Sequence, residues 1–277
     1  MSEKPRLGYI LMILPILIFI GLFVFYPYVI IVIRAFKDNY TGAFTLRNLQ
    51  NVFKISAFRT SVLNSLWFSF LTTLVSSVFG SLVGWVSTKI SDRSRNVLMS
   101  LFSVPMTLSG LVVAFSFIVL LGRNGVFNII LRGAGLPTFN LYSWGGLVIA
   151  YSFFNIPLFS LTMIGAFKNL DMSLVEAARN LGANIVQTWF YVVIPVLIPA
   201  FLAAFSIVFA GMMGAFGTVL ALTGLSRSLL SLQIYSHVSE SYYNVPQADA
   251  FALVLGSIVA MVLVVINFLE RKVRVKS

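Results

Sequence analysis

The chain has 277 residues, of which 59% are hydrophobic and only 10% are charged, and its formal net charge is +11 at pH 7. Soluble chains carry roughly 25% Asp, Glu, Lys and Arg, so this composition excludes an ordinary soluble globule. In so apolar a chain the basic excess indicates a membrane surface rather than nucleic acid. With no cysteine and one histidine, we expect no disulfide, no metal site and no cofactor bound by this chain.

Six stretches are long enough to cross a bilayer core of about 30 Å, which takes about 20 helical residues. None contains Asp, Glu, Lys, Arg or His. The first is too long for the apolar part of a signal peptide, about 7–15 residues, so we expect it to be retained. We predict an all-α integral membrane protein with six transmembrane helices in one domain, residues 1–277. The predicted spans are Tyr9–Ile33, Val62–Thr88, Val97–Leu121, Trp144–Phe167, Tyr191–Leu220 and Ala250–Leu269.

The segments between the spans differ in charge. With the N-terminus inside, the inner segments carry 11 basic residues in 47 positions and the outer segments carry 8 in 79. This bias predicts that both termini are cytoplasmic, and a seventh span would place the basic C-terminal tail outside. Apolar residues at helical spacing in Thr45–Phe58 and Asn124–Leu131 predict two short helices on the outer surface. In the last outer segment we expect His237 and Glu240 to be solvated loop residues.

Small and polar residues interrupt three of the predicted spans. Gly211, Gly214 and Gly217 recur every three residues in the fifth span, which indicates either a bend with a narrow pore wall or close helix packing. Polar positions beside prolines in the third and fourth spans are the other candidates to face a path. The candidate path residues are Met106, Ser109, Asn155, Gly211, Gly214 and Gly217.

The inner segment Lys168–Phe190 has the pattern of a folded element rather than a bare turn. Asp171 is a good N-cap, and Gly182 suits the position after a helix end. Asn184 followed by Gln187 predicts a capping box at the start of a second short helix. Such a helix pair can lie flat at the lipid headgroups or be offered to a soluble partner. The apolar stripe of the first helix comprises Leu174, Val175, Ala178 and Leu181, with Glu176, Arg179 and Asn180 on its other side.

One pattern in this segment carries a family resemblance. Glu176-Ala177-Ala178, three residues, Gly182, nine residues and then Val192-Val193-Ile194-Pro195 resembles the EAA motif of binding-protein-dependent ATP-binding cassette (ABC) importer permeases. That motif reads Glu-Ala-Ala-x3-Gly-x9-Ile-x-Leu-Pro, so Val192 and Ile194 are conservative exchanges. The six spans and the basic tail resemble the same family, and the branch that imports polyamines, ferric iron, thiamine and phosphonates is the most similar. The resemblance implies a MetI-like type I importer permease fold.

The resemblance also implies the partners and the role of the inner segment. It would be the coupling helix, docked in a groove of a separate ATPase that binds ATP and Mg, while this chain is a non-catalytic subunit without a Gly-x4-Gly-Lys-Ser/Thr phosphate loop. A second permease chain, identical or homologous, two ATPases and an extracytoplasmic binding protein would complete the importer in a bacterial or archaeal cell membrane. The implied coupling residues are Asp171, Leu174, Val175, Glu176, Ala177, Ala178, Arg179, Leu181, Gly182 and Pro195.

The substrate is the most open prediction. A polyamine such as spermidine or putrescine is the first candidate, followed by the related iron, thiamine or phosphonate solutes. An oxyanion is the alternative, because Gly214-Ala215-Phe216-Gly217 resembles the sulfate and molybdate permeases, although an acidic residue usual in that stretch is Ala215 here. A stand-alone secondary carrier or channel is a different possibility. Proton-driven carriers keep acidic residues or histidine inside their spans, and these spans have none.

Overall fold

The computed structural model describes residues 4–239 and 243–274, with side chains described for 12–239 and 243–272. Within these residues the protein is helical, and six helical stretches are long and apolar enough to cross a membrane. The predicted number of six spans is therefore confirmed. The stretches are Met12–Ala35, Ser56–Ser87, Gly110–Gly133, Trp144–Lys168, Ile185–Met213 and Val245–Lys272.

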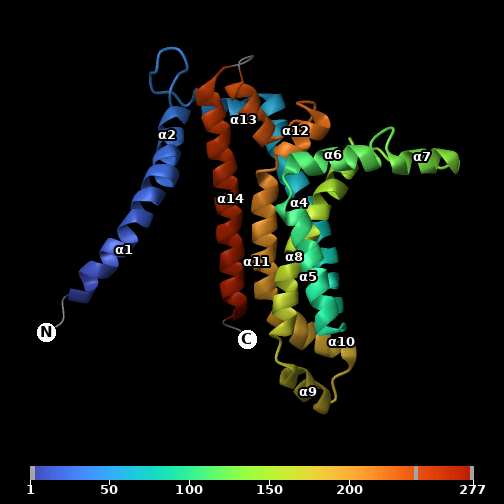
Figure 1. The fold of residues 1–277 in the computed structure, drawn as a ribbon. Coiled ribbons are helices and arrows are strands. Elements are labelled where there is room, and N and C mark those ends of the chain that lie inside the picture. Colours follow the sequence, from blue (N-terminus) through green and yellow to red (C-terminus); the bar gives the residue numbers. More distant parts are fainter. Residues whose placement is uncertain (1–3, 240–242, 275–277) are drawn as a thin grey trace.

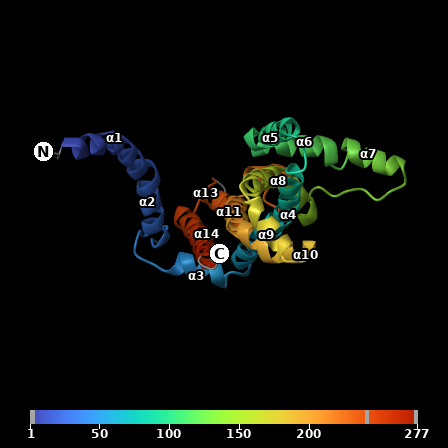
Figure 2. The same ribbon diagram turned by 90° about the horizontal axis from the view of Figure 1, so that it is seen from below.

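Four long helices and one shorter helix form the bundle (Figures 1 and 2). Helix α4 packs along α8 more extensively than any other pair of elements. Two glycines of α4 make this approach possible: a Cβ on Gly80 would lie 2.7 Å from Cβ of Phe159, and one on Gly84 would lie 2.6 Å from Cβ of Met163. The bundle helices are α4 (Ser56–Ser87), α5 (Asp92–Thr107), α8 (Trp144–Lys168), α11 (Ile194–Met213) and α14 (Val245–Arg274).

The first span is attached to the bundle at one end only. It consists of α1 (Lys4–Ile20), a π-helical turn η1 (Gly21–Phe25) and α2 (Tyr26–Ala35). Helix α2 packs against α14, where Nε of Arg34 lies 2.7 Å from Oδ2 of Asp249. Helix α1 diverges from the bundle (Figure 1), and its described large apolar side chains are exposed. This span therefore needs lipid or another protein around it.

Short helices gather at the end of the bundle that carries α3, which we call the α3 end (Figures 1 and 2). The two predicted surface helices are present with shifted bounds, as α3 (Arg47–Lys54) and α7 (Val126–Gly133). The prediction for His237 is wrong: it lies in α13 (Leu230–Val238), is 5% exposed and packs against the rings of Phe58 and Phe251. Glu240 lies outside the described residues.

Two predicted spans have the wrong bounds because their helices break. The span predicted at Val97–Leu121 is interrupted at the extended residue Leu108, and Ser109 caps a new helix, α6 (Gly110–Leu121). Helix α5 runs along the bundle, whereas α6 and α7, which make up the third of the six apolar stretches, are turned steeply away from that direction, and α7 extends beyond the bundle (Figures 1 and 2). The span predicted at Tyr191–Leu220 ends at Met213, and α12 (Gly217–Thr223) follows after a break. Hydropathy does not register either break because both sides are apolar.

Candidate functional site

The segment between α8 and α11 protrudes at the end of the bundle opposite to α3, which we call the α9 end (Figure 1). It contains α9 (Met172–Asn180), α10 (Ile185–Thr188) and the π-helical turn η2 (Trp189–Val193). Both predicted N-caps are confirmed. Oδ1 of Asp171 accepts from the backbone N–H of Ser173 at 2.9 Å, and Asn184 and Gln187 form the reciprocal capping box, each bond at 2.9 Å. These caps satisfy backbone N–H groups at the start of both helices with side chains of the segment itself.

The carboxylate of Asp171 is held in its charged form by this cap. The side chain and backbone N–H of Ser173 donate to it and lower the pKa of Asp171 below its ordinary value. A hydrogen bond to the charged form of a carboxyl group always has this direction. The cap therefore stays ionised at neutral pH and weakens only as the pH falls through the lowered pKa.

The bend between the two short helices is built around Gly182. Its φ is +87°, a conformation that a residue with a Cβ adopts only with strain. The N–H of Gly182 donates to the carbonyl of Arg179 at 2.9 Å, and that of Ala183 donates to Ala178 at 3.1 Å. Together these two bonds are a Schellman motif. The predicted helix end at Gly182 is confirmed, and the bend has a single preferred geometry.

The predicted coupling residues divide between two faces of α9. Val175 is only 9% exposed and belongs to the same apolar cluster as Val193 and Leu197, so it anchors the segment to the bundle. Leu181 is 89% exposed. Arg179 was placed with Glu176 on the opposite side from Val175, and this is wrong, because Arg179 lines a cavity together with Val175. A spacing of four residues puts both on one helix face. Leu174, Glu176, Ala177 and Gly182 are exposed, and Ala178 is half-buried.

The segment joins the fifth span through a widened helical turn. Helical backbone runs without interruption from Ile185 to Met213, with the π-helical turn η2 ending two residues before Pro195. Proline lacks the N–H that an α-helical ladder requires, and π-turns are one of the ways in which a helix accommodates such a local defect. Helices α10 and α11 are therefore joined by helical backbone without an intervening loop.

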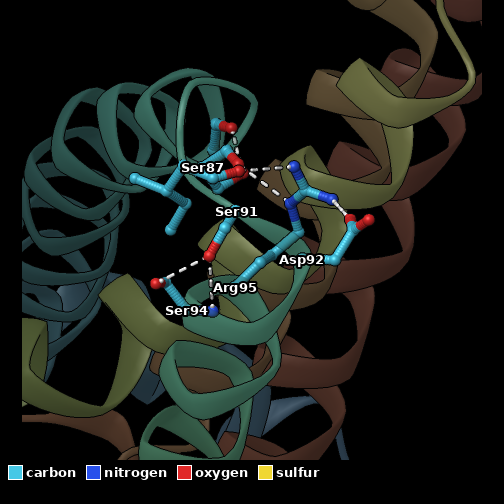
Figure 3. A network of polar contacts seen from close by, with 7 residues as sticks. Ser87, Ser91, Asp92, Ser94 and Arg95 are labelled. Carbon is cyan, nitrogen blue, oxygen red and sulfur yellow. Dashed lines mark hydrogen bonds and ion pairs between the residues drawn. The ribbon is translucent and has the colours of Figure 1, made fainter.

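The turn between α4 and α5 lies beside this segment and was not predicted as part of the site. Arg95 holds it together: Nε donates to the carbonyl of Ser87 at 2.8 Å, and Nη2 donates to that of Ile90 at 3.2 Å (Figure 3). Nη1 pairs with Asp92 at 2.5 Å. Ser91 caps α5 by accepting from the N–H of Ser94. No sequence signal marks Arg95, because its partners are mostly backbone carbonyls.

The two helix breaks meet each other at the α3 end. Oγ1 of Thr218, in α12, donates to the carbonyl of Gly110, the first residue of α6, at 2.9 Å. The N–H of Val219 donates to the hydroxyl of Tyr151 in α8 at 3.2 Å. The break before α12 frees N–H groups at the start of that helix, and the bond from Val219 to Tyr151 satisfies one of them, while the bond from Thr218 joins α12 to α6. The sequence does not mark Thr218 or Tyr151, because their bonds join residues that are 108 and 68 positions apart and leave no local pattern.

The structure places the six candidate path residues around these breaks. Ser109 is the N-cap of α6, and Nδ2 of Asn155 donates to the carbonyl of Tyr151 at 2.8 Å and approaches Sδ of Met212 at 3.1 Å. A Cβ on Gly211 or Gly217 would meet nothing within 4 Å, so close helix packing within this chain does not explain these glycines. Gly214 begins the break after α11. Met106 is exposed near the end of α5.

These features define a class of protein: a membrane bundle with a rigid, capped elbow at one end and broken spans at the other, which is the architecture of a transporter subunit. Residues 76–275 match the model of the family described as "Binding-protein-dependent transport system inner membrane component", and the chain belongs to this family. It is therefore the permease subunit of an ABC importer.

Similar curated proteins carry different solutes. The sulfate transport system permease protein CysT of Salmonella typhimurium is 28% identical over 224 residues, which cover 79% of this chain and 77% of that protein. The spermidine/putrescine permease PotB of Haemophilus influenzae is 28% identical over 247 residues, which cover 87% and 86%. The putative ferric permease FbpB 1 of the same species is 28% identical over 242 residues, but the chain spans only 38% of its length.

Solved structures confirm the fold. A bacterial alginate ABC transporter in complex with an alginate pentasaccharide-bound periplasmic protein aligns with a TM-score of 0.80 at 19% identity, covering 98% of this chain and 96% of that one. The MetNI methionine transporter in an inward-facing conformation aligns with a TM-score of 0.56 at 17% identity, covering 79% and 98%. The predicted MetI-like fold is thus confirmed.

Proposed function

We propose that the α9 segment is the coupling helix of this importer subunit, and that it faces the cytoplasm and docks on a separate ATPase. The observation that carries the proposal is the division of α9 into a buried anchor, Val175, and an exposed face with Glu176, Ala177 and Leu181. An element that transmits force must be fixed on one side and free on the other. The caps and the Gly182 bend make the segment stiff, and η2 joins it to the fifth span without a loop.

The remaining partners follow from the same proposal. The apolar side chains of α1 are exposed, so a second permease chain would pack against them. Lipid would cover the apolar side chains that this second chain does not contact. ATP and Mg belong to the two ATPase subunits. An extracytoplasmic binding protein would deliver its solute at the α3 end, beside the broken spans. The similar alginate transporter forms a complex with a periplasmic protein, which supports this kind of partner.

A thiol-labelling experiment tests the sidedness and the docking together. The chain has no cysteine, so Leu181→Cys creates a single thiol at a position that is 89% exposed. We expect this thiol to react with a membrane-impermeant maleimide in inside-out vesicles but not in right-side-out vesicles. Adding the cognate ATPase should slow the reaction severalfold, because docking buries the coupling helix.

The matched control is Val238→Cys, at an exposed position of α13 at the α3 end. It should react only in right-side-out vesicles, and the ATPase should leave its rate unchanged. Labelling of Leu181→Cys from the outside would contradict the proposed orientation. Equal labelling rates with and without bound ATPase would contradict the docking site, whichever side the thiol occupies.

The charge of the α3 end favours a small oxyanion as the solute over the polyamine predicted from the sequence. Asp249, which would serve a cationic solute, is already paired with Arg34. The only other carboxylate among the described residues of the α3 end is the exposed Asp38. The guanidinium of Arg227 lies there over the Trp144 ring, 5.1 Å from its centroid. Positive charge attracts an anionic solute and repels a polyamine. The basic residues of this end are Arg34, Lys37, Arg47, Lys54, Arg59, Arg123, Arg132 and Arg227.

Uptake in the complete importer separates the two solutes. Cells carrying this chain with its cognate ATPase and binding protein are given labelled sulfate or labelled spermidine. We expect ATP-dependent uptake of sulfate, because the charge of the α3 end favours anions, and no uptake of spermidine. Uptake of spermidine alone would overturn the oxyanion candidate and leave the coupling proposal intact.

A further inference from the structure

A cavity of about 590 Å³ lies at the α9 end of the bundle, and we call it the basic cavity. Its walls come from the C-terminal ends of α4 and α8, the start of α5, the short helices α9 and α10, and the turn η2. Residues 85–95 and residues 164–193, two segments far apart in the sequence, thus line one space. The residues that matter here are Lys89, Arg95, Lys168, Arg179, Trp85 and Trp189.

The charged side chains that line the basic cavity all have the same sign. Four of its lining residues are basic and none is acidic. Arg95 is fixed by its bonds to the α4–α5 turn and by Asp92. The side chains of Lys89, Lys168 and Arg179 make no hydrogen bond or ion pair with the part of the chain that the structure describes. Lys89 follows the end of α4 and Lys168 is the last residue of α8, and the helix dipole favours positive charge at both places.

The other residues that line the basic cavity include apolar and aromatic side chains. The rings of Trp85 and Trp189 meet edge to face with centroids 5.8 Å apart. Ile164, Phe167 and Val193 also line the cavity. Tryptophan is enriched where a membrane protein crosses from the lipid core to the headgroups. The cavity therefore combines basic side chains with an apolar surface that includes two tryptophans, the combination found where a membrane protein meets lipid headgroups.

We propose that the basic cavity binds the phosphate group of an anionic phospholipid, with the first carbons of its acyl chains against the tryptophan wall. Basic pockets between membrane helices are a known way to hold anionic headgroups. Free inorganic phosphate shares the headgroup's chemistry but makes no use of the apolar wall. Because Val175 and Arg179 of α9 line the same space, a bound lipid would stiffen the attachment of α9 to the bundle.

Lipid binding to the purified full chain tests the proposal without any ATPase, so the result is independent of the coupling proposal. Native mass spectrometry measures retention of phosphatidylglycerol and phosphatidylcholine by the wild type and by Lys89→Gln/Lys168→Gln. We expect the variant to bind phosphatidylglycerol about tenfold more weakly or worse, since each lysine near the surface contributes to anionic lipid binding. Binding of phosphatidylcholine should not change. The variant Lys89→Arg/Lys168→Arg should restore the binding, which separates lost charge from a folding defect.

The matched control is Arg93→Gln/Arg271→Gln, which removes two exposed charges from the same end of the bundle but outside the basic cavity. It should change the affinity less than about twofold. Equal losses in both double variants would overturn the proposal in favour of general surface charge. Failure of the wild type to prefer phosphatidylglycerol would also overturn it.

Two readouts identify the source of the phosphate and its place. Saturable binding of inorganic phosphate in calorimetry, with displacement of the lipid, would overturn the lipid assignment in favour of free phosphate. In a Trp67→Phe/Trp144→Phe background, Trp85 and Trp189 are the two remaining tryptophans, and their fluorescence is excited selectively over that of tyrosine. Brominated phosphatidylglycerol should then quench fluorescence more strongly than brominated phosphatidylcholine, and equal quenching would place the bound lipid elsewhere.

Discussion

Replacing Gly84 by leucine is expected to separate α4 from α8 and to lower the stability of the whole bundle. A Cβ at this position would lie 2.6 Å from Cβ of Met163 and 3.3 Å from its backbone carbonyl carbon. These atoms cannot move without displacing α8. Overpacking of this kind costs typically about 1–3 kcal/mol. The midpoint of thermal aggregation of the detergent-solubilised chain should fall by about 5 °C or more.

The control is Gly165→Leu, in α8, where a Cβ would meet nothing within 4 Å. It adds the same side chain to the same helix pair, on a face that is exposed in this chain. Its aggregation midpoint should stay within about 2 °C of the wild type. If Gly84→Leu were as stable as this control, the close packing of α4 on α8 would be wrong, and with it the rigid scaffold on which the α9 segment is mounted.

Replacing Val175 by aspartate is expected to disconnect the α9 segment from the bundle while leaving the spans inserted. Aspartate removes the apolar side chain that packs in the same cluster as Val193 and Leu197, and it puts a carboxylate at a position that is only 9% exposed, which is costly even one turn from Arg179. The segment should swing outward to hydrate the charge. We expect solute uptake by the complete importer to fall by about tenfold or more, because motion of the ATPase no longer reaches the fifth span.

Binding and coupling can be separated in the same variant. Because the exposed face of α9 is unchanged, the ATPase should still be retained in pull-down, while stimulation of ATP hydrolysis by the loaded binding protein is lost. The control Val238→Asp places the same charge at a position that is 50% exposed at the α3 end. It should leave basal ATP hydrolysis unchanged. Normal uptake by Val175→Asp would show that the anchor is not part of the transmission.

The sequence predicted the features that depend on short-range patterns. Six spans follow from hydropathy, because a helix in lipid must satisfy its own backbone bonds over about 20 residues. The caps at Asp171 and Asn184 and the bend at Gly182 follow from side-chain chemistry over three or four positions, and each is present in the structure. The family resemblance rests on the same short stretch, and the match over residues 76–275 confirms it.

Tertiary structure decided what each of these elements faces. Hydropathy cannot locate the breaks at Leu108 and after Met213, because the residues on both sides of each break are apolar. The bond that joins the two breaks, from Thr218 to Gly110, links residues that are distant in the sequence. Helical spacing put Val175 on the partner-facing stripe, but packing against the cluster around Val193 buries it. Arg179 lies on the same face of α9 as Val175, because four residues separate them, and both line the cavity beside the bundle.

The sequence by itself therefore determined the membrane class, the number of spans and the shape of the elbow between the fourth and fifth of them, because these depend on local backbone satisfaction. Only the tertiary structure decided which face of the elbow is anchored and which is free, and only it brought Lys89, Lys168 and Arg179 around one cavity. The physical reason is that packing partners lie on other helices, tens of residues away along the chain, where no periodicity records them.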